Sequence, residues 1–426
     1  MASAFHVKEH TFEAQHIREY PRATAHSQEE VLHVAVKQYI PKSNTNPQPG
    51  DITVIGAHAN GFPKELYEPL WEDIVTELGR KGVKVRGIWI ADVAWQGDSG
   101  ILNEDKLGND PSWLDHARDL LHMTNVFRAD MPRPLVGIGH SFGGNIIVNL
   151  SLLHPRLLSH LVLYDTVLSR FVGKGPDYGF MPMKMSSFRR DLWPSRQAAE
   201  EAFRKNGLFK TWDPRMLDAW CNWGVRECPT ALYPDKKNGE VTLRTSKHQE
   251  CFTYYRPLLQ GVDERGERAW DESKVPDLEK DYTTKYPEFP FYRPEGPSTT
   301  DKLPSLRPSV LWVYGEKSEV CAEGMREEKL RLTGIGVGGS GGVKTGMVKD
   351  VVIEKFGHLV PMEATTLCAR YAAESIVPAV KRWRKEEEDF KRWTRKTAAE
   401  KTMLDDDFKR WIGPVKSTKP GPKEKL

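Results

Sequence analysis

The chain of 426 residues can bury a large core, and its 39% hydrophobic, 28% charged and 10% aromatic residues are typical of a globular protein. A net charge of +3 and the lack of a groove-reading motif argue against nucleic acid as a partner. The five cysteines are scattered without a C-x-x-C pair, so neither a disulfide framework nor a metal site is predicted. Neither an apolar leader nor a run of about 18 apolar residues occurs, so no transmembrane segment is expected and an intracellular protein is predicted.

Short apolar runs alternate with helical patterns between residues 31 and 165, which is typical of βαβ units and a mostly parallel sheet. Residues 65–82 carry leucine and isoleucine at helical spacing and end on Gly82, which suits a C-terminal cap, so they predict a crossover helix. Strands are predicted within five runs: 31–40, 51–61, 83–92, 134–140 and 160–165.

The pattern changes beyond residue 169. Residues 170–300 are rich in Trp, Met, Pro and charge without convincing parallel strands, so we predict a helical cap inserted into the sheet. Strand patterns return at 309–315 and 348–358. The expected organisation is an α/β core in two parts (1–169 and 301–385), the cap (170–300) and a charged C-terminal tail (386–426).

A glycine-rich run lies between the last two predicted strands, where Gly334, Gly336 and Gly339 satisfy G-x-G-x-x-G. A dinucleotide site needs this motif after a strand and at the start of a helix, whereas here the run leads into a strand. We therefore predict a flexible loop and no cofactor.

The tail repeats one motif, DFKRW, at 389–393 and 407–411. The spacing equals about five helical turns, so one continuous helix would place both copies on the same face. Two interpretations stay open: a solvated helix whose Trp residues pack on the body, or a contact with a membrane surface or a partner.

Residues 139–143, Gly-His-Ser-Phe-Gly, fit G-x-S-x-G between a predicted strand and a helical pattern over 142–154. The glycines of this motif permit a strained turn that exposes the serine Oγ above the sheet. A serine hydroxyl attacks a carbonyl only when a base takes its proton. The sequence therefore predicts Ser141 as a nucleophile that needs a histidine.

That histidine is predicted to be His358, because the base follows the last strand in this arrangement. His140 is expected to pack against the turn, since neighbouring residues on a strand point to opposite faces. Two acids are candidates: Asp165, at the end of one predicted strand, and Glu319, in the loop after another. Either carboxylate would fix the tautomer of His358 and stabilise its cation.

A developing oxyanion needs hydrogen-bond donors, usually the amide after the nucleophile and one from an earlier loop. Phe142 supplies the first amide. The loop 57–65 contains the turn-forming pair Asn60-Gly61, so Asn60 is the predicted second donor, with Phe62 behind it.

Four segments, 58–71, 139–145, 336–348 and 357–363, together resemble the α/β-hydrolase superfamily. They look like its fungal branch, which holds the yeast peroxisomal lipase and peroxisomal toxin-biosynthesis hydrolases. The resemblance runs from about residue 30 to 385. It implies an α/β-hydrolase fold, a doubly wound sheet with a helical cap, and cleavage of an ester-like bond without a cofactor.

The expected function is that of a serine hydrolase, esterase-like or lipase-like, which cleaves an ester or thioester of an apolar or polyketide-like small molecule. An acyltransferase with the same residues and a non-catalytic, receptor-like protein are the alternatives. Aromatic and methionine residues in 177–185 and 212–223 suggest an apolar pocket, although most are expected to form the cap's own core. Peroxisomal members end in a Ser-Lys-Leu type signal, and this chain ends Glu424-Lys425-Leu426, so cytosolic and peroxisomal locations both stay open.

Overall fold

The computed structural model describes residues 4–168, 180–257, 275–279, 282–286 and 289–414. The terminal tripeptide and four parts of the predicted cap (170–179, 258–274, 280–281 and 287–288) lie outside these residues. The chain divides into two compact units, Met1–Val380 and Lys381–Leu426. Within the described ranges, no helix combines the length and the apolar character that crossing a bilayer requires.

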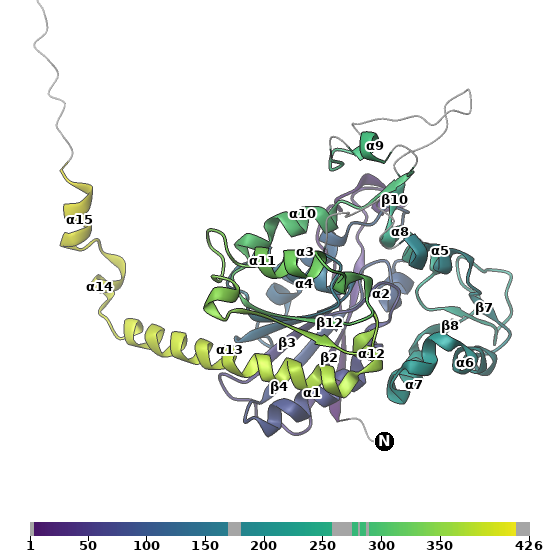
Figure 1. Ribbon diagram of the computed structural model, residues 1–426, viewed down its shortest axis with the longest axis horizontal. Coiled ribbons are helices and arrows are strands. Elements are labelled where there is room, and N and C mark those ends of the chain that lie inside the picture. Colours follow the sequence, from purple (N-terminus) through teal and green to yellow (C-terminus); the bar gives the residue numbers. More distant parts are fainter. Residues whose placement is uncertain (1–3, 169–179, 258–274, 280–281, 287–288, 415–426) are drawn as a thin grey trace, which may run out of the picture. The chain divides into compact units, whose positions relative to one another are not determined.

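An eight-stranded sheet forms the centre of the first unit, in the order β1-β2-β4-β3-β5-β6-β12-β13 (Figure 1). The strands β1 and β2 run antiparallel to their neighbours, and all other neighbouring strands are parallel. The predicted mostly parallel sheet is confirmed. The strands span Phe5–Glu13 (β1), His33–Pro41 (β2), Ile52–Ala57 (β3), Val85–Ala91 (β4), Leu135–His140 (β5), Leu158–Tyr164 (β6), Ser309–Gly315 (β12) and Val348–Ile353 (β13).

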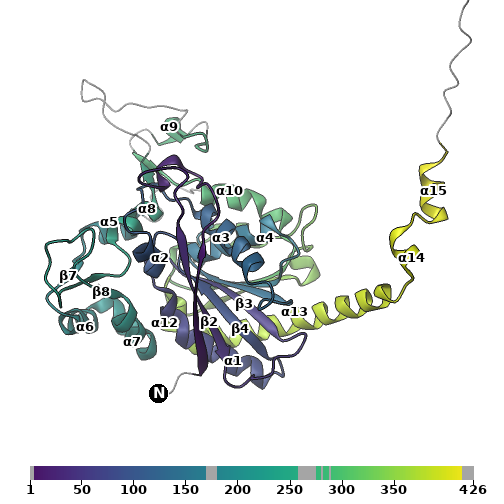
Figure 2. The ribbon, with the colours of Figure 1, turned by 180° about the vertical axis from the view of Figure 1, so that it is seen from behind.

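Strand β1 is not predicted by the sequence pattern. It pairs with β2 along its whole length, from Phe5 opposite Pro41 to Glu13 opposite His33, at the edge of the sheet (Figure 2). Only Phe5 and Phe12 of this strand are buried. An edge strand of this kind carries too few apolar residues to produce a strand signal.

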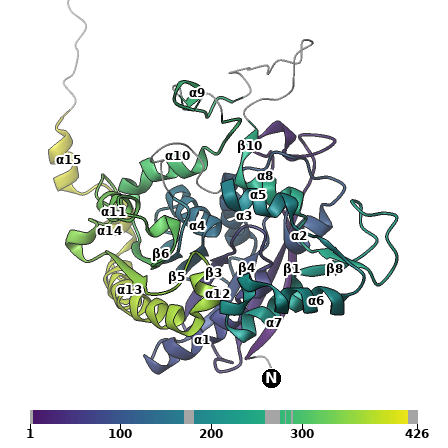
Figure 3. The same cartoon turned by 45° about the vertical axis from the view of Figure 1, so that its right-hand side comes forward.

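Helices cover both faces of the sheet, so the doubly wound arrangement is confirmed (Figure 3). On one face lie α1 (Glu68–Arg80) and the first part of α13 (Thr365–Thr394), and on the other lie α3 (Trp113–Val126) and α4 (Phe142–Leu153). Two-sided burial explains why β3, β5 and β12 are almost wholly apolar. Gly82 follows α1 with a φ of 72°, which confirms the predicted cap. The first unit also contains α2 (Gly97–Leu102), α11 (Met325–Leu332) and α12 (Val360–Glu363).

The segment between β6 and β12 contains helices, as predicted, but also short antiparallel strands. These strands form the sets β7-β9-β8 and β10-β11. Each is only two or three residues long, too short for a periodic signal. The described helices are α5 (Phe180–Phe188), α6 (Arg196–Lys205), α7 (Pro214–Trp223), α8 (Lys247–Tyr254), α9 (Tyr282–Lys285) and α10 (Glu295–Lys302). The strands are β7 (Leu192–Trp193), β8 (Val225–Glu227), β9 (Val241–Leu243), β10 (Arg256–Pro257) and β11 (Phe291–Tyr292).

The glycine-rich run 334–342 is a loop between α11 and β13, as predicted. Two of its amides donate to main-chain carbonyls outside the run: Gly334 donates to the carbonyl of Leu303 at 2.9 Å, and Gly336 donates to the carbonyl of Pro304 at 2.8 Å. The flexibility expected of this loop stays a prediction.

The second unit does not form the continuous helix considered from the sequence. Helix α13 ends at Thr394, and α14 (Ala398–Thr402) and α15 (Asp406–Ile412) begin anew. Thr397 and Asp405 cap these two helices with their side chains. The two DFKRW motifs therefore belong to different helices.

Candidate active site

Ser141 occupies a sharp turn between β5 and α4, which confirms the strand–turn–helix context of its motif. Its φ is 55° and its ψ −119°, a conformation that residues with a side chain rarely adopt. The main-chain amide of Ser141 donates to the carbonyl of Tyr164 at 2.9 Å, which anchors the turn to β6. The backbone thus presents Oγ beyond the carboxyl end of the sheet.

The two motif glycines are required by close packing. A Cβ at Gly143 would lie 2.3 Å from the carbonyl oxygen of Ala57, and one at Gly139 would lie 2.6 Å from that of Gly143. Neither contact involves a flexible side chain that could move away. Any larger residue would displace the turn that carries Ser141.

His358 lies in the loop after β13 and reaches Ser141 and Asp165 at once. Its Nε2 is 2.8 Å from Ser141 Oγ, and its Nδ1 is 3.0 Å from Asp165 Oδ2. Because a carboxylate only accepts, Nδ1 carries the proton and Nε2 is free to accept from the serine hydroxyl. The side chain of Asp165 is fully buried, whereas that of His358 is 39% exposed. The structure therefore brings Ser141, His358 and one of the two candidate acids into a single hydrogen-bonded series.

The other candidate, Glu319, lies in the wall of the adjoining cavity and is exposed to solvent. Among the described residues, no hydrogen bond joins Glu319 to His358. Both acids follow neighbouring parallel strands, β6 and β12, so both begin at the same edge of the sheet. Asp165 directly follows β6, with a φ of 44° and its amide donating to the carbonyl of Val313 at 2.7 Å, whereas Glu319 begins a 3-10 turn (Glu319–Cys321) beyond the end of β12.

The loop after β3 lies beside Ser141 and contains the predicted oxyanion donors. The carboxamide of Asn60 is already engaged: Nδ2 donates to the carbonyl of Glu250 at 3.0 Å, and Oδ1 accepts from Gln96 at 2.7 Å. Of Asn60, the main-chain amide is therefore the group left to bind a ligand. Among the described residues, neither this amide nor that of Phe142 donates a hydrogen bond. The ring of Phe62 stacks over that of His140, so Phe62 belongs to an aromatic wall.

A cavity of about 670 Å³ opens above Ser141 and His358. Most of its lining is apolar, and the aromatic part comes largely from the insertion: Trp193, Phe203, Phe209, Trp220, Tyr254 and Tyr255. Phe203 also packs edge to face against Phe209 and Trp220 within the buried core, and Phe209 stacks on Trp220. The same rings therefore serve both as the core of the insertion and as the surface of the cavity. From the sequence alone, these two roles are alternatives.

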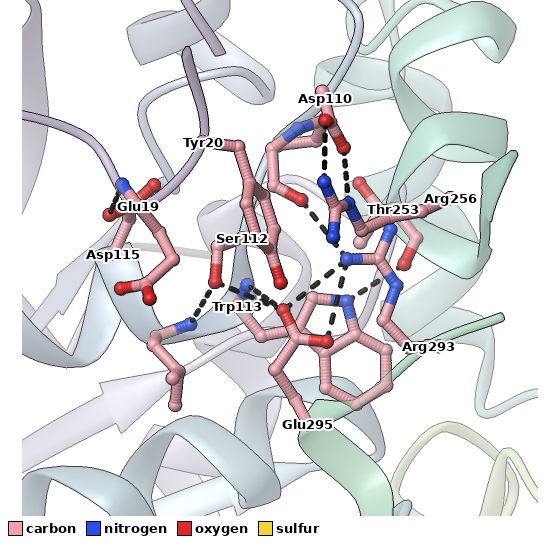
Figure 4. Close-up of polar contacts among 12 residues, drawn as sticks. Glu19, Tyr20, Asp110, Ser112, Trp113, Asp115, Thr253, Arg256, Arg293 and Glu295 are labelled. Atoms are coloured by element: carbon pink, nitrogen blue, oxygen red, sulfur yellow. Dashed lines mark hydrogen bonds and ion pairs between the residues drawn. The ribbon is translucent and has the colours of Figure 1, made fainter. Parts of the chain in front are cut away.

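The wall formed by Trp113 is fixed by a buried polar network (Figure 4). The indole of Trp113 donates to the carbonyl of Thr253 at 2.8 Å, and its main-chain amide donates to Glu295 at 2.9 Å. Nearby, Arg256 binds Asp110 through two hydrogen bonds of 2.6 and 2.8 Å. The desolvation cost of a buried ion pair is repaid only when its geometry is good and the remaining donors are bonded, and Arg256 also donates to Asp277 and Tyr292. The end of α8 is thereby attached to the core beside the cavity.

Some residues of the site carry no motif and are not predicted. Arg189 and Glu250 form an ion pair in the lining of the cavity. Both belong to the insertion, where no sequence motif marks their positions. Lys329, on α11, is buried behind the loop of Asp165, and its Nζ lies 3.4 Å from the carbonyl oxygen of Thr166. Among the described residues, no group of three or more potential metal ligands is found.

Comparisons with known proteins agree with this architecture. A profile of the alpha/beta hydrolase family matches residues 54–371. The type I acyl-CoA thioesterase mpaH of Penicillium roqueforti is 43% identical over 379 residues, 84% of each chain. The type I acyl-CoA thioesterase mpaH' of Penicillium brevicompactum is 42% identical over 407 residues, 91% of each chain. The peroxisomal alpha-beta-hydrolase Lpx1 of Saccharomyces cerevisiae is similar in fold, with a TM-score of 0.62 at 16% identity over 96% of this chain and 95% of that one.

Proposed function

Because the chain belongs to the alpha/beta hydrolase family, we propose that it is a serine thioesterase that hydrolyses the coenzyme A thioester of a small apolar acid. The observation that carries the proposal is the hydrogen-bonded series Asp165, His358 and Ser141 beneath an apolar cavity. The thioester preference rests on the relatives, two of which are named type I acyl-CoA thioesterases and are more than 40% identical to this chain over the aligned residues.

In the acylation step, Ser141 Oγ attacks the thioester carbonyl while its proton passes to His358 Nε2. Asp165 holds the imidazole in the productive tautomer and stabilises the resulting imidazolium. The tetrahedral intermediate collapses with cleavage of the C–S bond, and His358 returns the proton to the departing thiolate. The acyl group is then esterified to Ser141.

The negative charge on the intermediate is stabilised by the main-chain amides of Phe142 and Asn60, which donate to no acceptor among the described residues. The amide of Phe142 lies in the first turn of α4, where the helix dipole adds positive potential. In deacylation, a water molecule gives a proton to His358 and attacks the acyl-enzyme, and the free acid leaves with regeneration of Ser141.

The test is turnover of a series of acyl-CoA thioesters, from acetyl to palmitoyl, followed by release of the free thiol, with p-nitrophenyl esters of the same chain lengths beside it. We expect Ser141→Ala to lower kcat at least about 10³-fold, because the nucleophile is removed. Ser151→Ala is the matched control, since Ser151 is a buried serine on the same helix whose hydroxyl has no hydrogen-bond partner among the described residues.

Other outcomes identify the alternatives. A wild-type protein that hydrolyses esters but no thioester would contradict the coenzyme A substrate. Turnover that needs an added alcohol or amine, with the acyl group recovered on that acceptor, would indicate an acyltransferase. A folded wild-type protein without turnover in any of these assays would favour a receptor-like role.

A further inference from the structure

His140 forms two hydrogen bonds that lie outside the series of Asp165, His358 and Ser141. Its Nδ1 is 2.9 Å from the hydroxyl of Tyr67, and its Nε2 is 3.0 Å from the main-chain carbonyl oxygen of His358. The hydroxyl of Tyr67 is in turn 2.8 Å from the main-chain amide of Ala59. The side chains of His140 and Tyr67 are buried.

The direction of each of these hydrogen bonds follows from the donor and acceptor capacity of its two groups. A carbonyl oxygen only accepts, so His140 donates from Nε2 to His358, and an imidazole with one proton then accepts at Nδ1 from the Tyr67 hydroxyl. The Tyr67 oxygen accepts from the amide of Ala59. Burial, together with a smaller electrostatic contribution from the neighbouring imidazole of His358, lowers the pKa of His140 to about 3, which keeps the ring neutral. Each polar group is therefore satisfied, without an alternative arrangement.

The chain of bonds joins three loops that are separate in the sheet. Ala59 follows β3, His140 ends β5 and immediately precedes Ser141, and His358 follows β13. In the sheet, β13 is separated from β5 by β6 and β12, so no ladder of main-chain hydrogen bonds connects their ends. The bond from His140 to His358 spans 218 residues of sequence.

We propose that His140 and Tyr67 are positioning residues, which hold the main chain of His358 and the loop of Asn60 at fixed places relative to Ser141. This rests on the proposed serine chemistry. The bond to the carbonyl of His358 sets the height of the imidazole above Ser141. The bond from Ala59 to Tyr67 holds the residue next to the Asn60 amide. A displacement of the base by about 1 Å lowers the rate of such reactions by about 10²-fold, so loss of these bonds acts on kcat.

Three variants separate the hydrogen bonds from the packing. His140→Leu removes both bonds of the imidazole. His140→Gln keeps an acceptor for Tyr67 and a donor for the His358 carbonyl. Tyr67→Phe removes only the hydroxyl. The control is Tyr39→Phe, which removes the hydroxyl of a buried tyrosine that donates to Glu68 outside this site.

Two rates are measured on each folded variant: kcat and KM with an acyl thioester, and the rate at which a fluorophosphonate inactivates Ser141. We expect His140→Leu to lower kcat and the inactivation rate about 10²-fold with little change in KM, and Tyr67→Phe to lower both about tenfold. His140→Gln is expected to recover at least tenfold relative to His140→Leu, and Tyr39→Phe to behave like the wild type.

The fluorophosphonate reaction needs no thioester, so it tests the positioning role even if the proposed substrate is wrong. The proposal is overturned if His140→Leu or Tyr67→Phe is inactivated at the wild-type rate, or if His140→Gln is as slow as His140→Leu. If His140→Leu does not fold, Tyr67→Phe and His140→Gln decide by the same criteria. A wild-type protein that does not react with the probe would overturn both this proposal and the serine mechanism.

Discussion

The sheet core and the insertion contribute to the candidate site in different ways. The core supplies Ser141 and Asp165 from the ends of parallel strands, with main-chain φ angles of 55° and 44°. The insertion supplies most of the aromatic lining of the cavity from short helices and from strands of two or three residues. It is attached to the core by side-chain pairs such as Arg256 with Asp110.

This difference separates two ways of building a site. In the core, the atoms proposed to react are positioned by the backbone, so a small change there is expected to disturb their geometry. In the insertion, the cavity is shaped by packed side chains, whose replacement alters volume and contacts. We therefore expect core substitutions to act on kcat, and substitutions in the insertion to act on KM and on the preferred acyl length.

The largest effect is expected at the buried acid. Asp165→Asn keeps the shape of the side chain but cannot hold His358 in the required tautomer, so kcat should fall about 10³- to 10⁴-fold, measured by thiol release. Glu319→Gln should change kcat less than about tenfold. A severe loss in Glu319→Gln together with an active Asp165→Asn would show that the wrong carboxylate had been assigned.

A second test concerns the buried positive charge in the core. Burial lowers the pKa of Lys329 to about 8, although Asp165 partly opposes this shift. Between about pH 8 and 10.5 the unfolded chain thus holds a proton that the folded protein has released, so the Lys329 contribution to the free energy of unfolding increases as the pH rises.

Lys329→Met should therefore gain stability relative to the wild type below pH 8, and this difference should shrink by about 1 kcal/mol per pH unit above it. Urea unfolding at several pH values measures the stability gain below pH 8 and its decrease above pH 8. The control is Lys349→Met, because Lys349 is exposed on β13. A stability difference between the two proteins that stays constant from pH 7 to 10 would contradict a lowered pKa of Lys329.

The smallest effect is expected in the insertion. Leu208 lines the cavity and is about half exposed, so Leu208→Ala should fold normally. It removes apolar contact from a long acyl chain and should raise KM for such substrates about threefold while kcat stays unchanged. Leu232→Ala, which truncates another half-exposed leucine of the insertion away from this cavity, is the matched control. A fall in kcat with constant KM would contradict the division between core and insertion.

The parallel strands and the Ser141 turn could be predicted because their signals are local. Strands buried on both faces form continuous apolar runs, and the turn needs glycines at fixed offsets. Strand β1 could not be predicted, because only its two phenylalanines are buried. The short strands of the insertion are likewise too short to carry a period.

The sequence by itself determined the order of the core elements, the turn of Ser141 and the position of His358 after the last strand. Only the tertiary structure decided which carboxylate meets His358, because Asp165 and Glu319 both follow neighbouring strands. It also decided the partners of the Asn60 side chain, which forms hydrogen bonds with Glu250 and Gln96. The physical reason is distance along the chain: bonds between residues about 200 positions apart depend on strand order and backbone angles, which no local pattern records.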